Sequence, residues 1–482
     1  MRRTTINRLP DDVLLDIFDF CQIESNSHTM TSFRPDSHWL TLAHVCQRWR
    51  HTVLVSPRRL NITLFCTYGT PVRSHLGSLP PFPVIVDYLT FSHLALRPAP
   101  NHKDDIIAAL EHPNRVRSIK LDVTSRLLDM MALVTQQPFP ALTILWLSSN
   151  DQNAPVLPDS IFSIGPAPHL SQLFLEGVSF LALPSLLLSA NNLVDLQLKY
   201  THQSGYISPE AMAPSLAALK RLDNLCISFK APISHLHQQP RHSPVSTLHV
   251  LLSLVTFKFH GSSEYFEHLF AQIDTPRLCG IDITYFNQLD FQVPQLSQLI
   301  CCTERLWFAQ SRNLHGCIRI SSLYIELGFQ EEGHHLNRLS LRISCKWIDW
   351  QVLHLAQILG QCPALVSNVE YLSIDENLLQ IEPEDGIEDA DWLEVLRPFA
   401  AVKRLHGSKR LAGHIAFALD SVGGEMITDV LPALASLSLE DQLVRSVDQF
   451  LAARQISGHP VAFVDPGRCK FIHSLSNFSR PW

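Results

Sequence analysis

The sequence predicts an α/β fold in which an N-terminal helical module is followed by an irregular solenoid of strand–helix repeats with a parallel sheet. Two apolar faces at helical spacing occur within the first 55 residues, and a short leucine-rich phrase recurs beyond residue 110. The chain of 482 residues is 46% hydrophobic and 17% charged, as in packed globular proteins. We therefore expect most of the chain to fold.

Charge and cysteine usage limit the expected partners and compartment. The 38 basic and 45 acidic residues give a formal net charge of −7, and no long basic cluster occurs, so nucleic acid is not an expected partner. The 11 cysteines are scattered without a C-x-x-C motif, which favours reduced thiols in an intracellular protein. Polar residues interrupt the longest apolar run, Leu248 to Phe259, and the segment behind Arg2 and Arg3. We expect a cytoplasmic or nuclear protein that does not bind membranes.

Two amphipathic helices are predicted near the N-terminus. The first lies between Leu9 and Cys21, where apolar residues share one helical face at Leu14, Ile17, Phe18 and Cys21. Pro10 suits its first turn, and the two aspartates that follow complement the helix dipole. The second is predicted from the apolar positions Leu42, Val45, Cys46, Trp49 and Val53. A module this small buries little surface, so its apolar faces need a partner or the rest of the chain.

The strings LPDDVLLDIF at 9–18 and VCQRWR at 45–50 resemble the F-box. This resemblance implies binding to a Skp-type adaptor and, through it, to a cullin-based ubiquitin ligase. Carried over by position, the docking surface and its supporting core would comprise Leu9, Pro10, Leu14, Ile17, Val45, Cys46 and Trp49. The polar stretch from Gln22 to Asp36 departs from the short turn of many F-boxes, but a surface insert of that length costs little entropy. The alternative interpretation is that these residues form the local core of an ordinary helix pair.

A phrase of the form L-x-x-L-x-L, with conservative replacements, recurs along the rest of the chain. It begins at Val116, Leu142, Leu170, Leu193, Leu222, Leu254, Leu278, Thr303, Leu336, Val369, Val402 and Leu434. The mean step from Val116 to Leu434 is about 29 residues, at the upper end of the leucine-rich-repeat range. Each phrase predicts a short strand, and the remainder of each repeat is long enough for a helix that leads to the next parallel strand.

These patterns predict four segments along the chain. Residues 1–62 form the F-box-like helical module, residues 63–110 a linker and N-terminal cap, residues 111–445 the leucine-rich-repeat-like solenoid, and residues 446–482 a C-terminal cap and tail. Further stretches resemble phrases of a large group of fungal F-box proteins: Ser56 to Leu60 leading to Gly69 to Arg73, Leu396 to Phe399, and Ala452 to Val461.

Motifs of catalysis and cofactor binding are absent from the sequence. It contains no G-x-x-x-x-G-K-[ST], G-x-G-x-x-G, G-x-S-x-G or H-E-x-x-H. The histidine pairs 235/237 and 334/335 lack further ligands at a recurrent metal spacing, and the acidic stretch 382–391 lacks the ligand order of a calcium loop. We expect no cofactor, no metal and no catalytic activity of the chain's own.

In each phrase, the second and third apolar residues should point into the core. The single residue between them should therefore point away from the core. These residues are Lys120, Trp146, Phe174, Gln197, Lys258, Asp282, Trp307, Ser340 and Ser373. Trp146, Phe174 and Trp307 are the candidate substrate-binding residues, because large exposed aromatics are common binding anchors. Alternatively, irregular repeats bury them.

The expected function is that of a substrate-recognition subunit of a Skp-cullin-F-box type ubiquitin ligase, with an unknown protein substrate held by the repeats. One alternative is a repeat-based scaffold that recruits no ligase, and another is an enzyme with an unrecognised site.

Overall fold

The computed structural model describes residues 6, 9–23, 38–56, 62–67, 72–89, 102–134, 137–151, 154–158, 168–231, 248–286, 288, 290–302, 314–331, 339–345, 348–376, 389–422, 427–440 and 447–464. They fall into two compact units. Unit 1 comprises residues 1–195 and 204–206, and unit 2 comprises residues 196–203 and 207–482. Each unit is described by itself.

Unit 1 begins with helices α1 (Asp11–Ile23), α2 (His38–Val45) and α3 (Gln47–Val55). The prediction of one continuous second helix was wrong at Cys46, which has extended backbone angles of φ −160° and ψ 170°. The Sγ atom of Cys46 accepts a hydrogen bond from the backbone N–H of Trp49 at 3.4 Å. Cys46 therefore caps α3, and the apolar period continues across a break between two helices.

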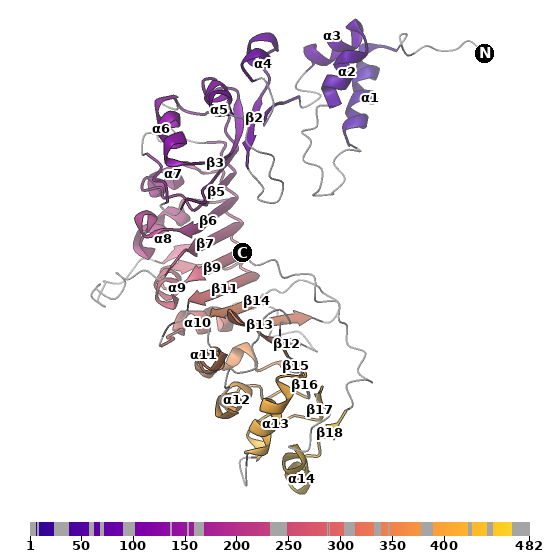
Figure 1. Cartoon of the computed structure of the whole chain (residues 1–482), viewed down its shortest axis with the longest axis vertical. Coiled ribbons are helices and arrows are strands. Elements are labelled where there is room, and N and C mark those ends of the chain that lie inside the picture. The colour runs from indigo at the N-terminus through magenta and orange to yellow at the C-terminus, as the bar shows by residue number, and fades with distance from the viewer. Residues whose placement is uncertain are drawn as a thin grey trace, which may run out of the picture. The chain divides into compact units, whose positions relative to one another are not determined.

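The rest of unit 1 is a parallel sheet with helices along one face (Figure 1). Its strands, in spatial order, are β1 (Leu64–Cys66), β2 (Val84–Tyr88), β3 (Val116–Asp122), β4 (Ile144–Ser148) and β5 (Gln172–Glu176). Its helices are α4 (Val72–Ser78), α5 (His102–Leu110), α6 (Ser125–Val134) and α7 (Leu183–Ser189). The strands pair in phase, with Leu145 opposite Ile119 on one side and Leu173 on the other. The inward apolar residues therefore form one shared core.

Unit 2 continues the strand–helix alternation. Its strands are β6 (Asp195–Thr201, of which Asp195 belongs to unit 1), β7 (Asn224–Phe229), β8 (His249–Val250), β9 (Thr256–Gly261), β10 (Ile273–Asp274), β11 (Gly280–Phe286), β12 (Leu314–Ile320), β13 (Tyr324–Glu331), β14 (Leu339–Ser344), β15 (Val369–Glu376), β16 (Arg404–Gly407), β17 (Ser436–Leu439) and β18 (Ala462–Phe463). Its α-helices are α8 (Pro209–Ala217), α9 (Ser263–Phe270), α10 (Pro294–Cys302), α11 (Ile348–Gln361), α12 (Asp389–Leu396), α13 (Ala412–Asp420) and α14 (Asp448–Ile456). The short 3₁₀ turn η6 (Pro363–Leu365) also belongs to unit 2, whereas η3 (Gln203–Gly205) has its first residue in unit 2 and the other two in unit 1.

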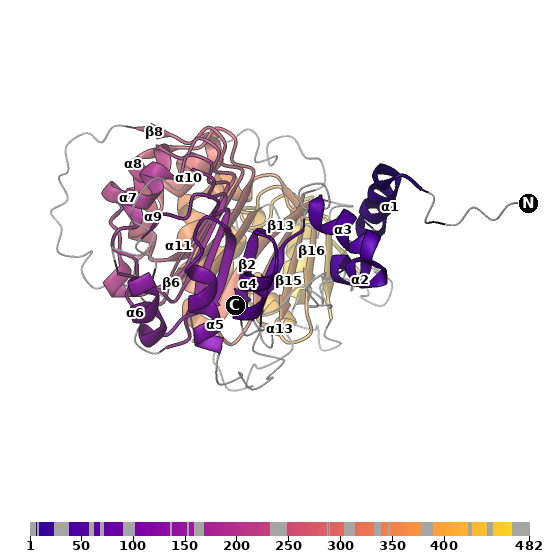
Figure 2. The ribbon, with the colours of Figure 1, turned by 90° about the horizontal axis from the view of Figure 1, so that it is seen from above.

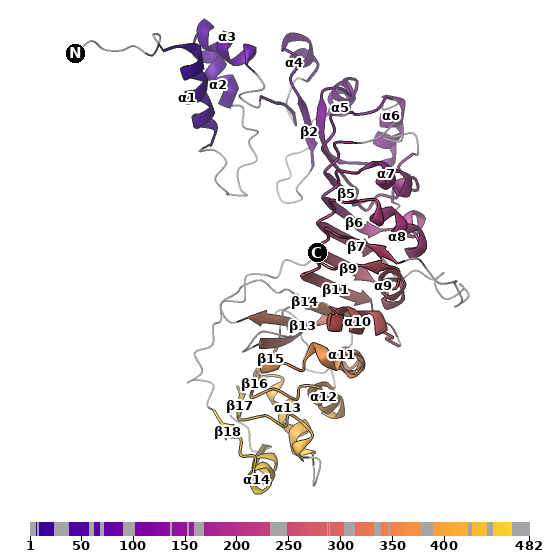
Figure 3. The same cartoon turned by 180° about the vertical axis from the view of Figure 1, so that it is seen from behind.

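The main sheet of unit 2 has the strand order β6-β7-β9-β11-β14-β13-β12-β15-β16-β17-β18, and β8 pairs separately with β10. Helices α8, α9 and α10 lie along one side of strands β7, β9 and β11, and no described helix covers the opposite side of these strands (Figures 2 and 3). One strand and one helix per repeat is the leucine-rich-repeat arrangement. The predicted α/β class with a parallel repeat sheet is confirmed, whereas the predicted segment boundaries stay predictions.

An antiparallel hairpin interrupts this parallel sheet. Strand β13 runs antiparallel to both β12 and β14, while β14 pairs in parallel with β11, and β12 with β15. Helix α11, the longest described helix at 14 residues, packs on β13 and β14. From this helix the buried Gln351 donates to the carbonyls of Ser321 at 2.9 Å and Cys345 at 2.6 Å. The hairpin was not predicted, and the phrase at Thr303 lies outside the described residues.

A buried arginine closes the last repeat of unit 2. The side chain of Arg454 in α14 is fully buried and donates to backbone carbonyls of Ile427, Leu431, Pro432 and Leu434 at 3.2–3.4 Å. These carbonyls belong to the segment before β17, where the carbonyl of Leu431 also accepts from the backbone N–H of Leu434 at 3.0 Å. Arg454 therefore supplies one charged donor group to four backbone carbonyls of this segment.

We expect Leu196→Asp in β6 and Leu339→Asp in β14 each to lower the free energy of unfolding by about 4 kcal/mol or more, because each places an unpaired carboxylate in the core. Both leucines are at most 1% exposed. Urea denaturation and limited proteolysis would measure the effect. Gln197→Asp is the matched control, since Gln197 is the next residue of β6 and is half-buried on the other face. Equal stability of the leucine variants and the control would refute the inward assignment.

Candidate functional site

The N-terminal helices are held together by a small core and a solvent-exposed ion pair. Leu14 and Phe18 of α1 are fully buried, and the rings of Phe18 and Trp49 lie 4.7 Å apart. Arg48 of α3 bonds to Asp11 Oδ1 through Nη2 at 2.6 Å and also donates to the carbonyl of Leu9. These contacts fix the start of α1 against α3, so the opposite face of α1 is held outward.

That outward face of α1 is apolar. Val13, Ile17 and Phe20 are spaced at i, i+4 and i+7, so they lie on one side of the helix, and they are 37%, 37% and 65% exposed. Val45, at the end of α2, is 57% exposed. Asp16 and Asp19 on the same helix are also exposed. A helix that places three apolar side chains in water beside a formed core is suited to binding another protein.

A second surface is the sheet face of unit 1 that lies opposite the helices, called here open face 1. It contains one row of directly paired residues, Asp87, Lys120, Trp146 and Phe174. The rings of Trp146 and Phe174 stack with centroids 4.7 Å apart and an interplanar angle of 19°. Both side chains are half-buried, and the Lys120 Nζ lies 3.8 Å from Asp87 Oδ2. The structure thus brings together two of the three candidate aromatics, and Trp307 lies outside the described residues.

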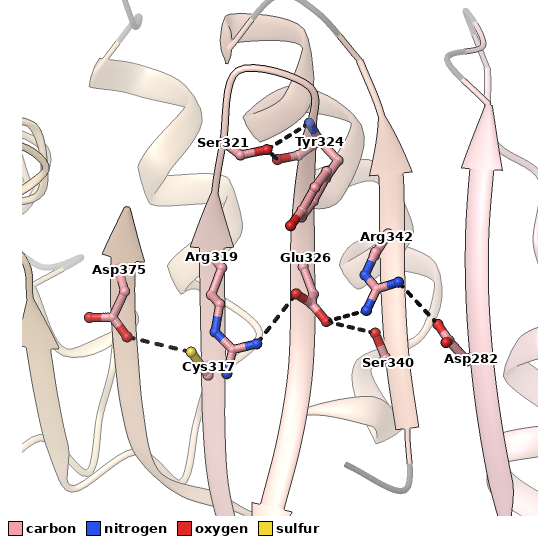
Figure 4. A network of polar contacts seen from close by, with 9 residues as sticks. All are labelled: Asp282, Cys317, Arg319, Ser321, Tyr324, Glu326, Ser340, Arg342 and Asp375. Atoms are coloured by element: carbon pink, nitrogen blue, oxygen red, sulfur yellow. Dashed lines mark hydrogen bonds and ion pairs between the residues drawn. The ribbon is translucent and has the colours of Figure 1, made fainter. Parts of the chain in front are cut away.

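The corresponding face of unit 2, open face 2, holds a row of alternating charges across the inserted hairpin (Figure 4). The carboxylate of Glu326 in β13 accepts from Arg319 in β12 at 3.3 Å and from Arg342 in β14 at 3.1 Å. Ser340 also donates to it at 2.9 Å, and Arg342 pairs with Asp282 at 3.7 Å. Burial opposes ionisation, but the two arginines and Ser340 hold the pKa of Glu326 below its usual value. The two carboxylates and the two guanidinium groups of this network therefore balance one another's charge.

Two residues predicted to be exposed on this face are buried. Ser340 and Ser373 are each 5% exposed, so the prediction was wrong for their exposure, although their side chains do face away from the core. Ser340 is covered because it bonds to Glu326 of the neighbouring strand, and Ser373 because its Oγ lies 3.2 Å from His315 Nε2. Longer side chains on adjacent strands close over both hydroxyls.

The titratable groups beside Ser373 are held in their uncharged forms. Burial lowers the pKa of His315 to about 4, so this imidazole is neutral at physiological pH. Burial raises the pKa of the Cys317 thiol to about 12, and its Sγ lies 3.5 Å from Asp375 Oδ2. A thiol that stays protonated is a poor nucleophile. These groups can hold the strands together and line a binding surface, and they form no activated nucleophile.

A family model described as F-box-like matches residues 6–56. The N-terminal helices are an F-box-like domain. No curated protein matches the sequence. Two solved structures give low TM-scores. One is a chain of the yeast Rad7–Elc1 complex, with 10% identity, coverage of 90% of this chain and 89% of that chain, and a TM-score of 0.29. The other is the leucine-rich-repeat-containing protein LegL7 from Legionella pneumophila, with 11% identity, coverage of 83% and 99%, and a TM-score of 0.26.

Within the F-box-like domain, the seven predicted site residues divide by exposure. Pro10, Ile17 and Val45 are exposed, Leu9, Cys46 and Trp49 are partly exposed, and Leu14 is fully buried. Sequence reasoning missed Val13 and Phe20 as surface residues. The spacing of Val13, Ile17 and Phe20 could have indicated a second apolar face on this helix. Ile17 was instead predicted to lie on the same face as Leu14.

No helix in the described parts of the chain is long and apolar enough to cross a membrane. Among the same residues, no group of three or more histidines, cysteines and carboxylates is arranged to hold a metal ion.

We expect Glu326→Gln to lower the free energy of unfolding by about 1–3 kcal/mol, because Arg319 and Arg342 lose a shared charged partner. Since the folded-state pKa of Glu326 is depressed, its contribution is present above its usual value of 4.5 and is lost as pH falls through the folded pKa. Urea denaturation of both proteins between neutral and acid pH should show the difference shrinking at acid pH.

The matched control is Glu394→Gln, which removes an exposed carboxylate of α12 that pairs with Arg397, the residue after this helix. Its effect should be within about 0.5 kcal/mol. An effect of Glu326→Gln no larger than that of the control would show that the network does not stabilise the hairpin.

Proposed function

We propose that this protein is the substrate-recognition subunit of a Skp-cullin-F-box type ubiquitin ligase. The F-box-like domain at residues 6–56 is the observation that carries the proposal. The domain would bind a Skp-type adaptor, and the adaptor a cullin scaffold. The repeats would hold a protein substrate, and partner proteins would perform ubiquitin transfer, so no catalytic residue is needed in this chain.

The adaptor-binding surface is assigned to the outward face of α1 and the end of α2. Ile17 and Val45 are its exposed apolar centre, with Leu9 and Pro10 at the start of α1. Val13 and Phe20 extend the same face. Leu14, Cys46 and Trp49 have a supporting role, because they shape the core and the α2–α3 junction behind this surface. Burying three to four such side chains at an interface supplies apolar contact of the size that anchors protein complexes.

The substrate site is assigned to the repeats, with Trp146 and Phe174 on open face 1 and Trp307 as a further candidate. A stacked aromatic pair that is half-buried has a fixed geometry, so little side-chain entropy is lost when a partner binds. We further propose that the protein is of the fungal F-box type and acts in the cytoplasm or nucleus. The four segments at 1–62, 63–110, 111–445 and 446–482 belong to the same proposal.

We expect the double variant Ile17→Asp with Phe20→Asp to weaken binding to a purified Skp-type adaptor by about thirtyfold or more, because two exposed apolar anchors become charged. Both side chains point outward, so circular dichroism of the variant should match that of the unaltered protein. Quantitative pull-down or calorimetry with the full chain measures the affinity.

Leu133→Asp provides the matched control, since Leu133 is 76% exposed on α6 in the same unit. It should leave adaptor binding unchanged. If the unaltered, folded protein does not bind the adaptor, the proposal fails and a repeat scaffold without ligase recruitment becomes the better account.

A further inference from the structure

Open face 1 contains two neighbouring rows of different chemistry. The first is the row of Lys120, Trp146 and Phe174, and the second, two residues further along each strand, is the row of Asp122, Ser148 and Glu176. Residues two apart on a strand point to the same face and lie about 6.6 Å apart. Carboxylates therefore lie one row beyond the stacked aromatic pair.

The charge of this face is predominantly negative. Asp87, Asp122 and Glu176 supply three carboxylates, and Lys120 is the single cation in the paired rows. Lys120 lies within ion-pair distance of Asp87, which directs its ammonium group toward β2. Glu176 is half-buried and forms no ion pair with any described residue. A cation arriving beside Phe174 would therefore meet a carboxylate that lacks a counter-ion.

Open face 2 has a different electrostatic character. There the carboxylate of Glu326 is shared by Arg319 and Arg342, and Arg342 also pairs with Asp282. A charged partner that bound to these side chains would have to displace the ion pairs that they already form with one another. Electrostatic attraction of a charged partner is thus expected at open face 1 rather than at the charge network of open face 2.

We propose that open face 1 binds an extended segment of the substrate that presents a large apolar side chain and, two residues away, a lysine or arginine. This inference rests on the proposed function and specifies the chemistry of its substrate. The apolar side chain packs on the edges of the Trp146 and Phe174 rings. The cation lies over the neighbouring row, near Glu176. An extended segment repeats its side-chain direction every two residues, which matches the spacing of the two rows.

The test uses a phage-displayed library of random dodecapeptides selected on the full-length chain, followed by affinity measurements with the enriched peptides. Enriched sequences should combine an aromatic or aliphatic residue with Lys or Arg two positions away. Trp146→Ala should weaken their binding by about tenfold or more, and Glu176→Lys by about threefold to tenfold. Raising the salt concentration from about 50 to about 500 mM should also weaken binding, because the attraction is screened.

Two controls keep the result interpretable. Glu111→Lys makes the same charge change at an exposed position after helix α5 and should leave affinity unchanged. Trp146→Leu retains apolar bulk and reports whether loss of binding in Trp146→Ala reflects misfolding. Absence of enrichment, enrichment of acidic peptides, or equal binding to Glu176→Lys and Glu111→Lys would each overturn the inference. Adaptor pull-down from the same preparations tests the proposed function separately. If the adaptor does not bind but the peptides do, the proposed function fails and open face 1 is the peptide-binding surface of a scaffold.

Discussion

Alternate residues of every strand must point into a core that no single repeat can enclose. The parallel strands satisfy this requirement by pairing in phase, so that Leu225, Phe257 and Ile281 lie side by side on adjacent strands. Each apolar side chain then contacts equivalents on both neighbours and a helix behind them. The residues between them are freed from the core. Open faces 1 and 2 can therefore differ in charge and aromatic content while the backbone arrangement stays the same.

The hairpin of β12 and β13 shows how far this arrangement tolerates change. Strand β12 still pairs in parallel with β15, and β14, the other partner of β13, pairs in parallel with β11, so the inward stripe continues through Ile318 and Leu327. Reversal of β13 places Glu326 directly between Arg319 and Arg342. The Ser321 hydroxyl, which accepts from the backbone N–H of Tyr324 at 3.1 Å, closes the turn. Charge pairing on one face and α11 on the other hold an inserted pair of strands within a parallel array.

The repeated leucines were sufficient to predict strands β3 to β7, β9, β11 and β14 to β17, because burial of alternate residues depends only on local spacing. The break at Cys46 was not predictable from the same spacing, since an apolar period continues unchanged through a cap. The hairpin was missed because Ile325, Leu327 and Phe329 alternate without the leading leucine of the phrase. Burial of Ser340 and Ser373 depends on long side chains from strands distant in sequence. The exposure of Phe20 on α1 could be predicted only by knowing that the opposite side of the helix, with Leu14, packs into the core.

Arg454 has a consequence for how the protein is made. Its guanidinium comes from α14, whereas the carbonyls that it binds lie 20 to 27 residues earlier in the chain. During synthesis, the turn before β17 is therefore complete well before its hydrogen-bond donor exists. A chain that stops short of α14 would leave these carbonyls without the guanidinium, and a turn that stays open to solvent favours proteolysis. The turn can therefore complete its hydrogen bonding only after α14 has been synthesised.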